Sequence, residues 1–217
     1  NYCFSSDMGN EMLWAAVHAE RTALARDLDS LSDQQWSAPT ACPGWDVHDV
    51  LAHLVDSAKT TRIGFVLDML ACRFDFDKAN ERGIRRERRA DPRETLASLS
   101  GVINRTTTPP APLATRLVEA FVHGEDIRRA IGLHGSYPAE HVATALRYQV
   151  RTSFAWGGGR ERCERVRLVV SDSDFVVGDG SQVCGTSIAL LLAVSGRPVK
   201  DGELTGDGAG ALMEARR

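Results

Sequence analysis

The spacing of apolar residues changes near Gly135, and this change constrains the fold more than any other feature of the 217-residue chain. From Met8 to about Leu133, apolar residues recur at intervals of three, four and seven, which is typical of amphipathic helices. Beyond Gly135, short β-branched runs accompany helix-like segments. We therefore expect an α+β fold, with a helical unit over residues 8–134 and a small α/β unit over residues 135–217.

Four main helices are expected in the first unit, over residues 8–28, 47–58, 92–103 and 113–130. Asp46 can cap the second helix, and Asp91 followed by Pro92 is typical of the start of the third. The segment Thr106–Pro112, with the sequence TTTPPAP, must interrupt helical structure before the fourth begins. Connections of moderate length between four helices favour an antiparallel bundle.

The second unit is expected to mix helices with short strands. A helix is predicted over residues 139–155 and ends before the glycines at 157–159, which cannot continue it. Two strands are predicted over residues 166–170 and 174–177, and a buried helix over residues 186–195. A short extended piece near residues 203–205 and a last helix from about Gly208 complete the unit.

Composition excludes several classes of protein. The formal net charge of −3 gives no basic field for binding nucleic acid. The longest apolar stretch, Ser187–Val194, is far shorter than the roughly 20 residues that cross a bilayer, so no membrane span is expected. The first residues do not have the charged and apolar regions of a secretory signal. Five cysteines without a CxxC pair indicate reduced thiols, and the expected location is cytoplasmic.

Three residues are candidate metal ligands: His53, Glu119 and His123. On a helical projection, His53 lies away from the apolar arc of its helix, and Glu119 and His123 share a second polar strip, one turn apart, on another helix. Such strips face solvent on a lone helix, but in a bundle two of them can meet in a cleft and hold a cation. Two imidazoles and a carboxylate are the ligands of a catalytic zinc that keeps one position open.

Three long segments carry a resemblance to a known family. They are APTACPGWDVHDVLAHLVD, TRLVEAFVHGEDIRRAIG and LLLAVSGRPVKDGELTGDG, in this order. Together they resemble the mycothiol-dependent maleylpyruvate isomerase family. The resemblance implies a DinB-like four-helix bundle followed by a smaller domain similar to sterol-carrier proteins. It also implies that His53, Glu119 and His123 bind Zn²⁺ or another divalent metal.

The resemblance further implies an isomerase or S-transferase that uses mycothiol as a thiol cosubstrate. A thiol activated at the metal would attack a small electrophile similar to maleylpyruvate. The family has a catalytic arginine in its C-terminal segment, and Arg197 stands at the corresponding place. An arginine at a helix end that neutralises the helix dipole is the structural alternative for Arg197.

Several alternatives stay open at this stage. A metal-dependent hydrolase would use metal-bound water in place of the thiol, and a non-catalytic module would bind a metal or an apolar ligand only. Asp126 could orient an imidazole or be a surface carboxylate, and Cys42 could be reactive or structural. Trp45 is expected to be a packing anchor. The expected partners are a small electrophile and a low-molecular-weight thiol, and the chain is expected to be a monomer or homodimer.

Overall fold

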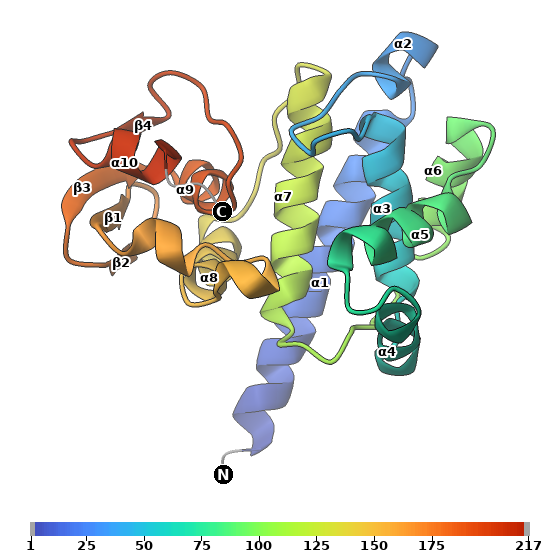
Figure 1. Ribbon diagram of the computed structural model, residues 1–217, viewed down its shortest axis with the longest axis horizontal. Coiled ribbons are helices and arrows are strands. Elements are labelled where there is room, and N and C mark those ends of the chain that lie inside the picture. The colour runs from blue at the N-terminus through green and yellow to red at the C-terminus, as the bar shows by residue number, and fades with distance from the viewer. Residues whose placement is uncertain (1–2, 215–217) are drawn as a thin grey trace. The chain divides into compact units, whose positions relative to one another are not determined.

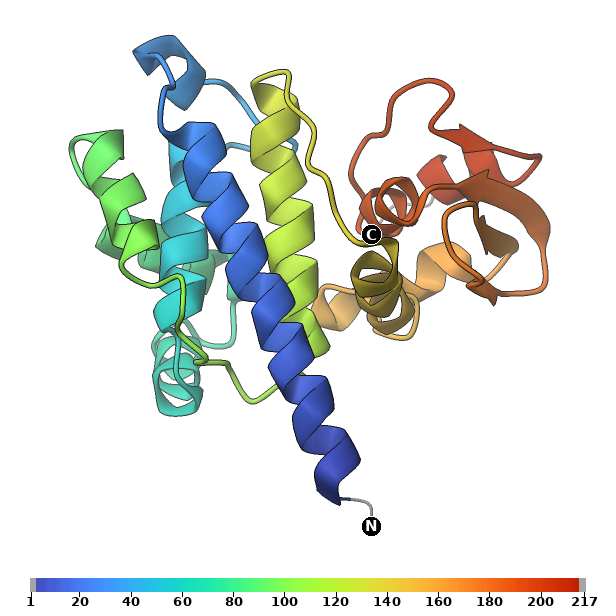
Figure 2. The same ribbon diagram turned by 180° about the vertical axis from the view of Figure 1, so that it is seen from behind.

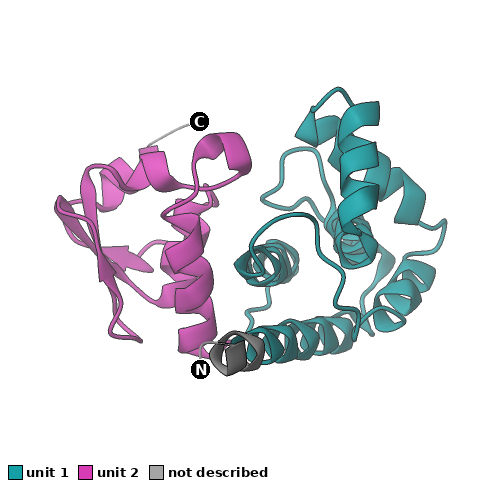
Figure 3. Ribbon diagram, turned by 90° about the horizontal axis from the view of Figure 1, so that it is seen from below, with its two compact units in different colours: residues 1–135 teal, residues 136–217 magenta. Residues whose placement is uncertain are grey.

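The structure is a computed structural model that describes residues 3–214, with the side chains described from residue 9 onward. The chain forms two compact units, Asn1–Gly135 and Ser136–Arg217 (Figure 3). The side chain of Cys3, one of the predicted free thiols, lies outside the described residues. The cysteines Cys42, Cys72, Cys163 and Cys184 are free, as the sequence predicts.

The first unit is helical throughout. Its elements are α1 (Cys3–Leu28), α2 (Asp33–Trp36), α3 (Val47–Lys59), α4 (Arg62–Ala71), α5 (Phe76–Glu87), α6 (Pro92–Ser100) and α7 (Ala114–Ala130). The predicted helices correspond to α1, α3, α6 and α7, and these pack as a bundle in which α1 contacts α6 and α7, and α3 contacts the same two helices. Figures 1 and 2 show that α1 and α7 run in one direction and α3 in the other.

The core of this unit lies between these four helices. Leu51 and Val55 of α3 and Leu99 of α6 are fully buried there, together with Ile127 of α7. These side chains occupy the apolar stripe of each helix at the spacing that the sequence predicts. Burying each large aliphatic side chain contributes about 1.5–3 kcal/mol to folding. The core therefore fixes how α3 and α7 are rotated towards each other.

Helices α4 and α5 were not predicted from the sequence. Helix α5 was missed because its sequence, FDKANERGIRRE, has too few apolar residues to show a helical period. Its N-terminus is capped by the Asp75 side chain, and Arg86 binds both Asp56 of α3 and Asp68 of α4. Ion pairs to neighbouring helices thus replace the apolar stripe on much of its surface.

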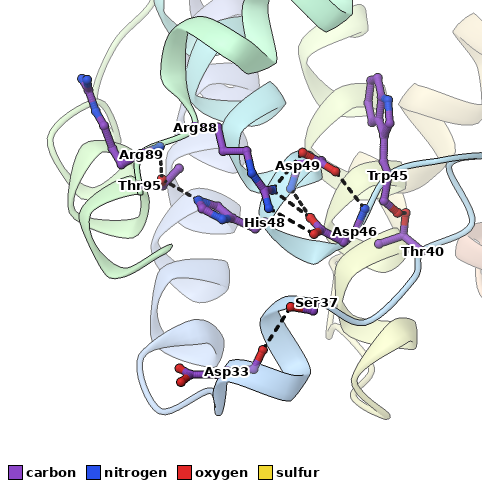
Figure 4. A network of polar contacts seen from close by, with 10 residues as sticks. All are labelled: Asp33, Ser37, Thr40, Trp45, Asp46, His48, Asp49, Arg88, Arg89 and Thr95. Atoms are coloured by element: carbon purple, nitrogen blue, oxygen red, sulfur yellow. Dashed lines mark hydrogen bonds and ion pairs between the residues drawn. The ribbon is translucent and has the colours of Figure 1, made fainter. Parts of the chain in front are cut away.

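The start of α3 is fixed by a polar network (Figure 4). Asp46 accepts a hydrogen bond from the backbone of Asp49, and the Asp49 side chain accepts one from the backbone of Asp46, which completes a capping box. Arg88 donates to both carboxylates at 2.8–3.2 Å. His48 bonds Thr95 of α6 at 2.8 Å. The predicted cap at Asp46 is confirmed, and the network holds α3 against its neighbours.

The second unit combines a small mixed sheet with helices. Its elements are α8 (Ala139–Gln149), η1 (Phe154–Trp156), η2 (Arg160–Cys163), β1 (Val166–Val170), β2 (Val176–Val177), β3 (Ser181–Gly185), α9 (Ser187–Val194), β4 (Leu204–Thr205) and α10 (Ala209–Glu214). The strand order is β2-β1-β3-β4, with β1 and β3 parallel and the outer pairs antiparallel. The predicted α+β class is confirmed.

Two details of the second unit differ from the sequence prediction. The helix predicted over residues 139–155 ends at Gln149, and a short 3₁₀ turn follows, so the break begins before the glycines. Strand β3 was missed, because its sequence SQVCG has one β-branched residue, Val183, and no alternation. Among the described residues, no helix combines the length and apolar character that a membrane span requires.

Candidate metal centre

The structure brings His53, Glu119 and His123 together inside the first unit. His53 comes from the middle of α3, and Glu119 and His123 come from successive turns of α7. One ligand atom from each residue lies within 4.8 Å of the other two. His53 Nε2 is 3.3 Å from Glu119 Oε2, and the two imidazole rings are 4.8 Å apart between centroids. The three predicted ligands therefore share one site, although they are up to 70 positions apart in the sequence.

The separation of these atoms suits a tetrahedral cation. Two ligands that are each about 2.0–2.1 Å from a tetrahedral zinc ion lie about 3.4 Å apart. The measured 3.3 Å between His53 Nε2 and Glu119 Oε2 is close to this value. Two neutral imidazoles and one carboxylate also form the donor set of catalytic zinc sites. The residues present thus fit a zinc ion by both spacing and chemistry.

An unsatisfied carboxylate oxygen supports the same fit. Glu119 Oε2 is buried, and its polar neighbour His53 Nε2, at 3.3 Å, does not form a well-aligned hydrogen bond with it. Leaving a buried polar atom unpaired costs about 1–3 kcal/mol, and more when it is charged. Burial acts to raise the pKa of Glu119, but the neighbouring His53, Arg116 and His123 outweigh it and hold that pKa well below its usual range. The carboxylate is therefore ionised and aimed at a place where a cation would satisfy it.

Several polar side chains at this site are buried, unlike those on a solvent-exposed helix face. His53 is 7% exposed, and Arg116 and Asp126, which share the polar strip of α7, are 6% and 2% exposed. The strips of α3 and α7 thus face each other between the helices. Of the two roles considered for Asp126, a surface carboxylate is excluded by its burial.

Asp126 and Cys42 support His123 from its other side. Asp126 Oδ2 lies 3.0 Å from His123 Nδ1, and Cys42 Sγ donates to the same oxygen at 3.1 Å. A carboxylate that accepts from Nδ1 fixes the tautomer of the ring, so Nε2 is left unprotonated and free to bind a metal. Cys42 lies on the loop before α3 and is buried. The contacts around His123 therefore join two distant parts of the chain.

Cys42, His123 and Asp126 form a second cluster with possible ligand spacing. It shares His123 with the first cluster, and its Cys42–His123 distance is 3.7 Å. In this cluster the thiol and the imidazole already bond the carboxylate, so each polar group has a partner. Glu119 Oε2 lies 3.3 Å from His53 Nε2 but has no well-aligned hydrogen bond among the described residues. The unsatisfied group therefore favours the His53, Glu119 and His123 set for a cation.

Trp45 packs beside the candidate site. Its ring lies 5.2 Å from the ring of His53 between centroids and is tilted by 45°. It also packs partly buried against the apolar core of the unit. Both contacts fit the predicted packing anchor. The side chain limits the rotamers of His53, so it helps to hold that ring in place.

A cavity opens beside His53 and Glu119. Its volume is about 90 Å³, and it is lined by residues of α3, α4, α5 and α7. Phe65, Met69 and Phe76 form an apolar wall, while Arg116 and Glu119 are charged groups at the metal side. The site thus combines candidate ligands with a partly open cavity that can hold a small molecule.

Arg197 lies in the second unit, after α9. It is half-buried, and its Nη1 donates to the carbonyl oxygen of Ser195 at 3.3 Å. This contact with the residue that ends α9 is the one expected of a helix-end arginine. The catalytic role of Arg197 stays a prediction.

Sequence reasoning missed Arg116 as a site residue. Arg116 lies on the same polar strip as Glu119 but was not among the predicted site residues, and the structure buries it at the cavity. The available signal was its spacing, because Arg116 precedes Glu119 by three residues on one helix face. That spacing alone cannot distinguish a cleft from solvent.

Comparison with known proteins supports the family resemblance. Residues 17–108 match the family model described as the mycothiol maleylpyruvate isomerase N-terminal domain. No curated protein sequence matches the chain significantly. Two crystal structures of the mycothiol-dependent maleylpyruvate isomerase have a similar fold, one of them of a histidine-to-alanine mutant. Each has a TM-score of 0.63 and covers 92% of this chain and 93% of its own, at 14% identity for the mutant and 15% for the other structure.

Proposed function

We propose that this chain, whose residues 17–108 match the family model of the mycothiol maleylpyruvate isomerase N-terminal domain, is a zinc-dependent enzyme that uses mycothiol. The observation that carries the proposal is the convergence of His53, Glu119 and His123 within 4.8 Å beside a partly open cavity. Two solved structures of similar fold are of a mycothiol-dependent isomerase. The match to the family supports the proposed reaction class, and the cluster of candidate ligands supports the proposed place of reaction.

His53, Glu119 and His123 would hold the zinc ion. A bound zinc ion would lower the pKa of a thiol and so supply a thiolate nucleophile at neutral pH. Asp126 keeps the proton of His123 on Nδ1, and the Trp45 ring restrains His53. Phe65, Met69 and Phe76 keep water away from one side of the cavity. These residues bind and orient the reactants, and they exclude water.

The substrate in this proposal is a small electrophile similar to maleylpyruvate. The thiolate sulfur forms a bond to one carbon of a cis double bond that is conjugated to a carbonyl group, and the π electrons move onto the carbonyl oxygen as an enolate. The former double bond can then rotate as a single bond. When the enolate re-forms the carbonyl and the double bond, the sulfur–carbon bond breaks, which returns the thiolate and leaves the trans isomer. If the enolate is instead protonated and the adduct released, the enzyme is an S-transferase. Both reactions use the same residues.

A metal-dependent hydrolase is the second candidate. The same three ligands would suit it, because two histidines and a carboxylate also hold zinc in hydrolytic enzymes. The domain family favours the thiol over water. A cytoplasmic location and a monomeric or homodimeric state accompany the proposal as predictions.

Metal analysis combined with a thiol-consumption assay tests the proposal. We expect the purified protein to bind one zinc ion and to consume mycothiol with an electrophile. His53→Ala and Glu119→Ala should lose both properties while staying folded by circular dichroism. His18→Ala is the matched control, since His18 contacts the carbonyl oxygen of Arg105 and lies outside the cluster.

Cys42→Ser separates the two ligand sets. If His53, Glu119 and His123 bind the metal, this variant keeps its zinc. Loss of zinc in Cys42→Ser, with retention in Glu119→Ala, would assign the metal to Cys42, His123 and Asp126 and overturn the proposed ligand set. Hydrolysis without any response to mycothiol would establish the second candidate function.

A further inference from the structure

The guanidinium of Arg116 is buried but makes only part of its possible hydrogen bonds. The residue is 6% exposed. Its Nη1 donates to Ser57, at 2.7 Å to the hydroxyl and 3.3 Å to the carbonyl oxygen. Its Nε is buried without a partner among the described residues, and no described residue bonds its Nη2. A guanidinium has five N–H donors, and the two of Nη2 are bonded to no described residue, so this end of the group can donate to a ligand.

Arg116 lies at the cavity beside the candidate metal centre. It stands one helical turn before Glu119 on α7, and both residues line the 90 Å³ cavity together with His53. A water needs about 10–15 Å³ of such space, so the cavity has room for roughly six to nine small atoms. A four- or five-carbon acid is of this size.

The charges around Arg116 leave it without a dedicated counter-ion. Among the described residues, no carboxylate oxygen lies within ion-pair distance of its guanidinium. The other two acids on the cavity wall, Asp56 and Asp68, are both bound by Arg86. Glu119 is the remaining acid, and it faces His53. Glu119 therefore acts on Arg116 only at longer range, and its own ion-pair partner is His53.

We propose that Arg116 binds a carboxylate group of the substrate in this cavity. The identification of this ligand as the reacting substrate rests on the proposed function, but the anion binding itself does not. A guanidinium can hold a carboxylate through two parallel hydrogen bonds, and burial strengthens them. Such a clamp fixes one end of the molecule while its other end lies near His53 and Glu119.

Binding of maleate to the metal-free protein tests this inference directly. Maleamide is the control ligand, since it has the same shape without the negative charge. Measured by titration calorimetry, the metal-free protein is expected to bind maleate and to bind maleamide at least 10-fold more weakly. Arg116→Gln should weaken the affinity for maleate by roughly 10- to 100-fold, the effect of losing charge-assisted hydrogen bonds, and leave maleamide unaffected. Arg85→Gln, at an exposed site on α5, is the matched control and should bind maleate as the parent does.

A second measurement avoids any dependence on the variant's folding. In the unsubstituted protein, the ¹⁵Nε resonance of Arg116 should shift on addition of maleate and stay in place with maleamide. No shift, or equal affinity of the parent and Arg116→Gln for maleate, would overturn the inference. Because these measurements need no metal or thiol, failure of the proposed zinc chemistry would appear separately, as a protein that binds maleate through Arg116 but binds no zinc.

Discussion

Removal of the Asp126 carboxylate should weaken metal binding, although all three proposed ligand residues stay in the sequence. Asp126 is 2% exposed, and its Oδ2 lies 3.0 Å from His123 Nδ1 and accepts from Cys42 Sγ at 3.1 Å. In Asp126→Ala the proton on His123 Nδ1 loses its carboxylate acceptor, and only the weaker acceptor Cys42 Sγ remains nearby, at 3.7 Å. The ring is then free to change its tautomer or its rotation, and either change turns an unprotonated nitrogen away from the metal.

The magnitude follows from the role of such carboxylates. Removing a partner that orients a metal-bound histidine typically costs 10- to 100-fold in metal affinity, or about 1.4–2.7 kcal/mol. The substitution also removes the strong hydrogen bond of a largely buried N–H donor, which costs about 1–3 kcal/mol of folding stability. Both effects come from one hydrogen bond, so they should be seen together.

Competition for zinc with a chromogenic chelator measures the affinity, and urea unfolding of the metal-free protein measures the stability. Asp126→Asn serves as the comparison, because its amide oxygen can still accept from His123 when the amide is suitably turned, and it should lose less affinity than Asp126→Ala. An unchanged zinc affinity in Asp126→Ala would refute the idea that this carboxylate fixes the His123 tautomer.

Two further predictions concern the polar network at the start of α3. Arg88→Ala should lower the free energy of unfolding by about 1 kcal/mol, because Arg88 donates hydrogen bonds to both carboxylates of the capping box. Urea titration measures this loss. An equal loss in 1 M salt would contradict an electrostatic origin, since salt screens interactions between charges. Burial, together with the nearby Arg88, lowers the pKa of His48 to about 4. The unfolded chain therefore binds a proton more readily than the folded one, and stability should fall as the pH drops from about 6.5 towards 4. Between pH 7.5 and 5.5 the free energy of unfolding should fall by about 1.3 kcal/mol because of His48. Thermal unfolding measured at both pH values should therefore show a weaker pH dependence in His48→Gln than in the parent protein.

The helices of the bundle could be predicted where an apolar period and an end signal coincide. Asp46 before α3 and Asp91-Pro92 before α6 mark their starts, and both helices bury the residues that the period selects. Helix α5 lacks this period, because ion pairs of Arg86 with Asp56 and Asp68 connect it to its neighbours. Contacts of this kind depend on residues 18 or more positions away, which a local pattern does not contain.

The candidate ligands could be proposed from spacing and from the family motifs, but their surroundings could not. Whether the polar strips of α3 and α7 meet depends on how the core rotates each helix, and that is set by packing between distant segments. The contact of Cys42 with Asp126 joins residues 84 positions apart. A helical projection of either segment alone shows a polar face, but it does not show whether that face is exposed to solvent or buried between helices. Arg116 is an example, because it lies on the polar face of α7 and is buried.

The position of the proposed ligands on two bundle helices has a consequence for folding. A zinc ion held by His53 together with Glu119 and His123 would tie α3 to α7, and these helices are connected by more than 50 residues of chain. Such a tie acts as a reversible cross-link. An ion that binds only the folded chain stabilises it, and the unfolding temperature of the chain rises roughly with the logarithm of the concentration of the ion. Depletion of zinc would then destabilise the whole helical unit as well as stop the reaction. The supply of the metal would therefore influence the lifetime of the folded protein.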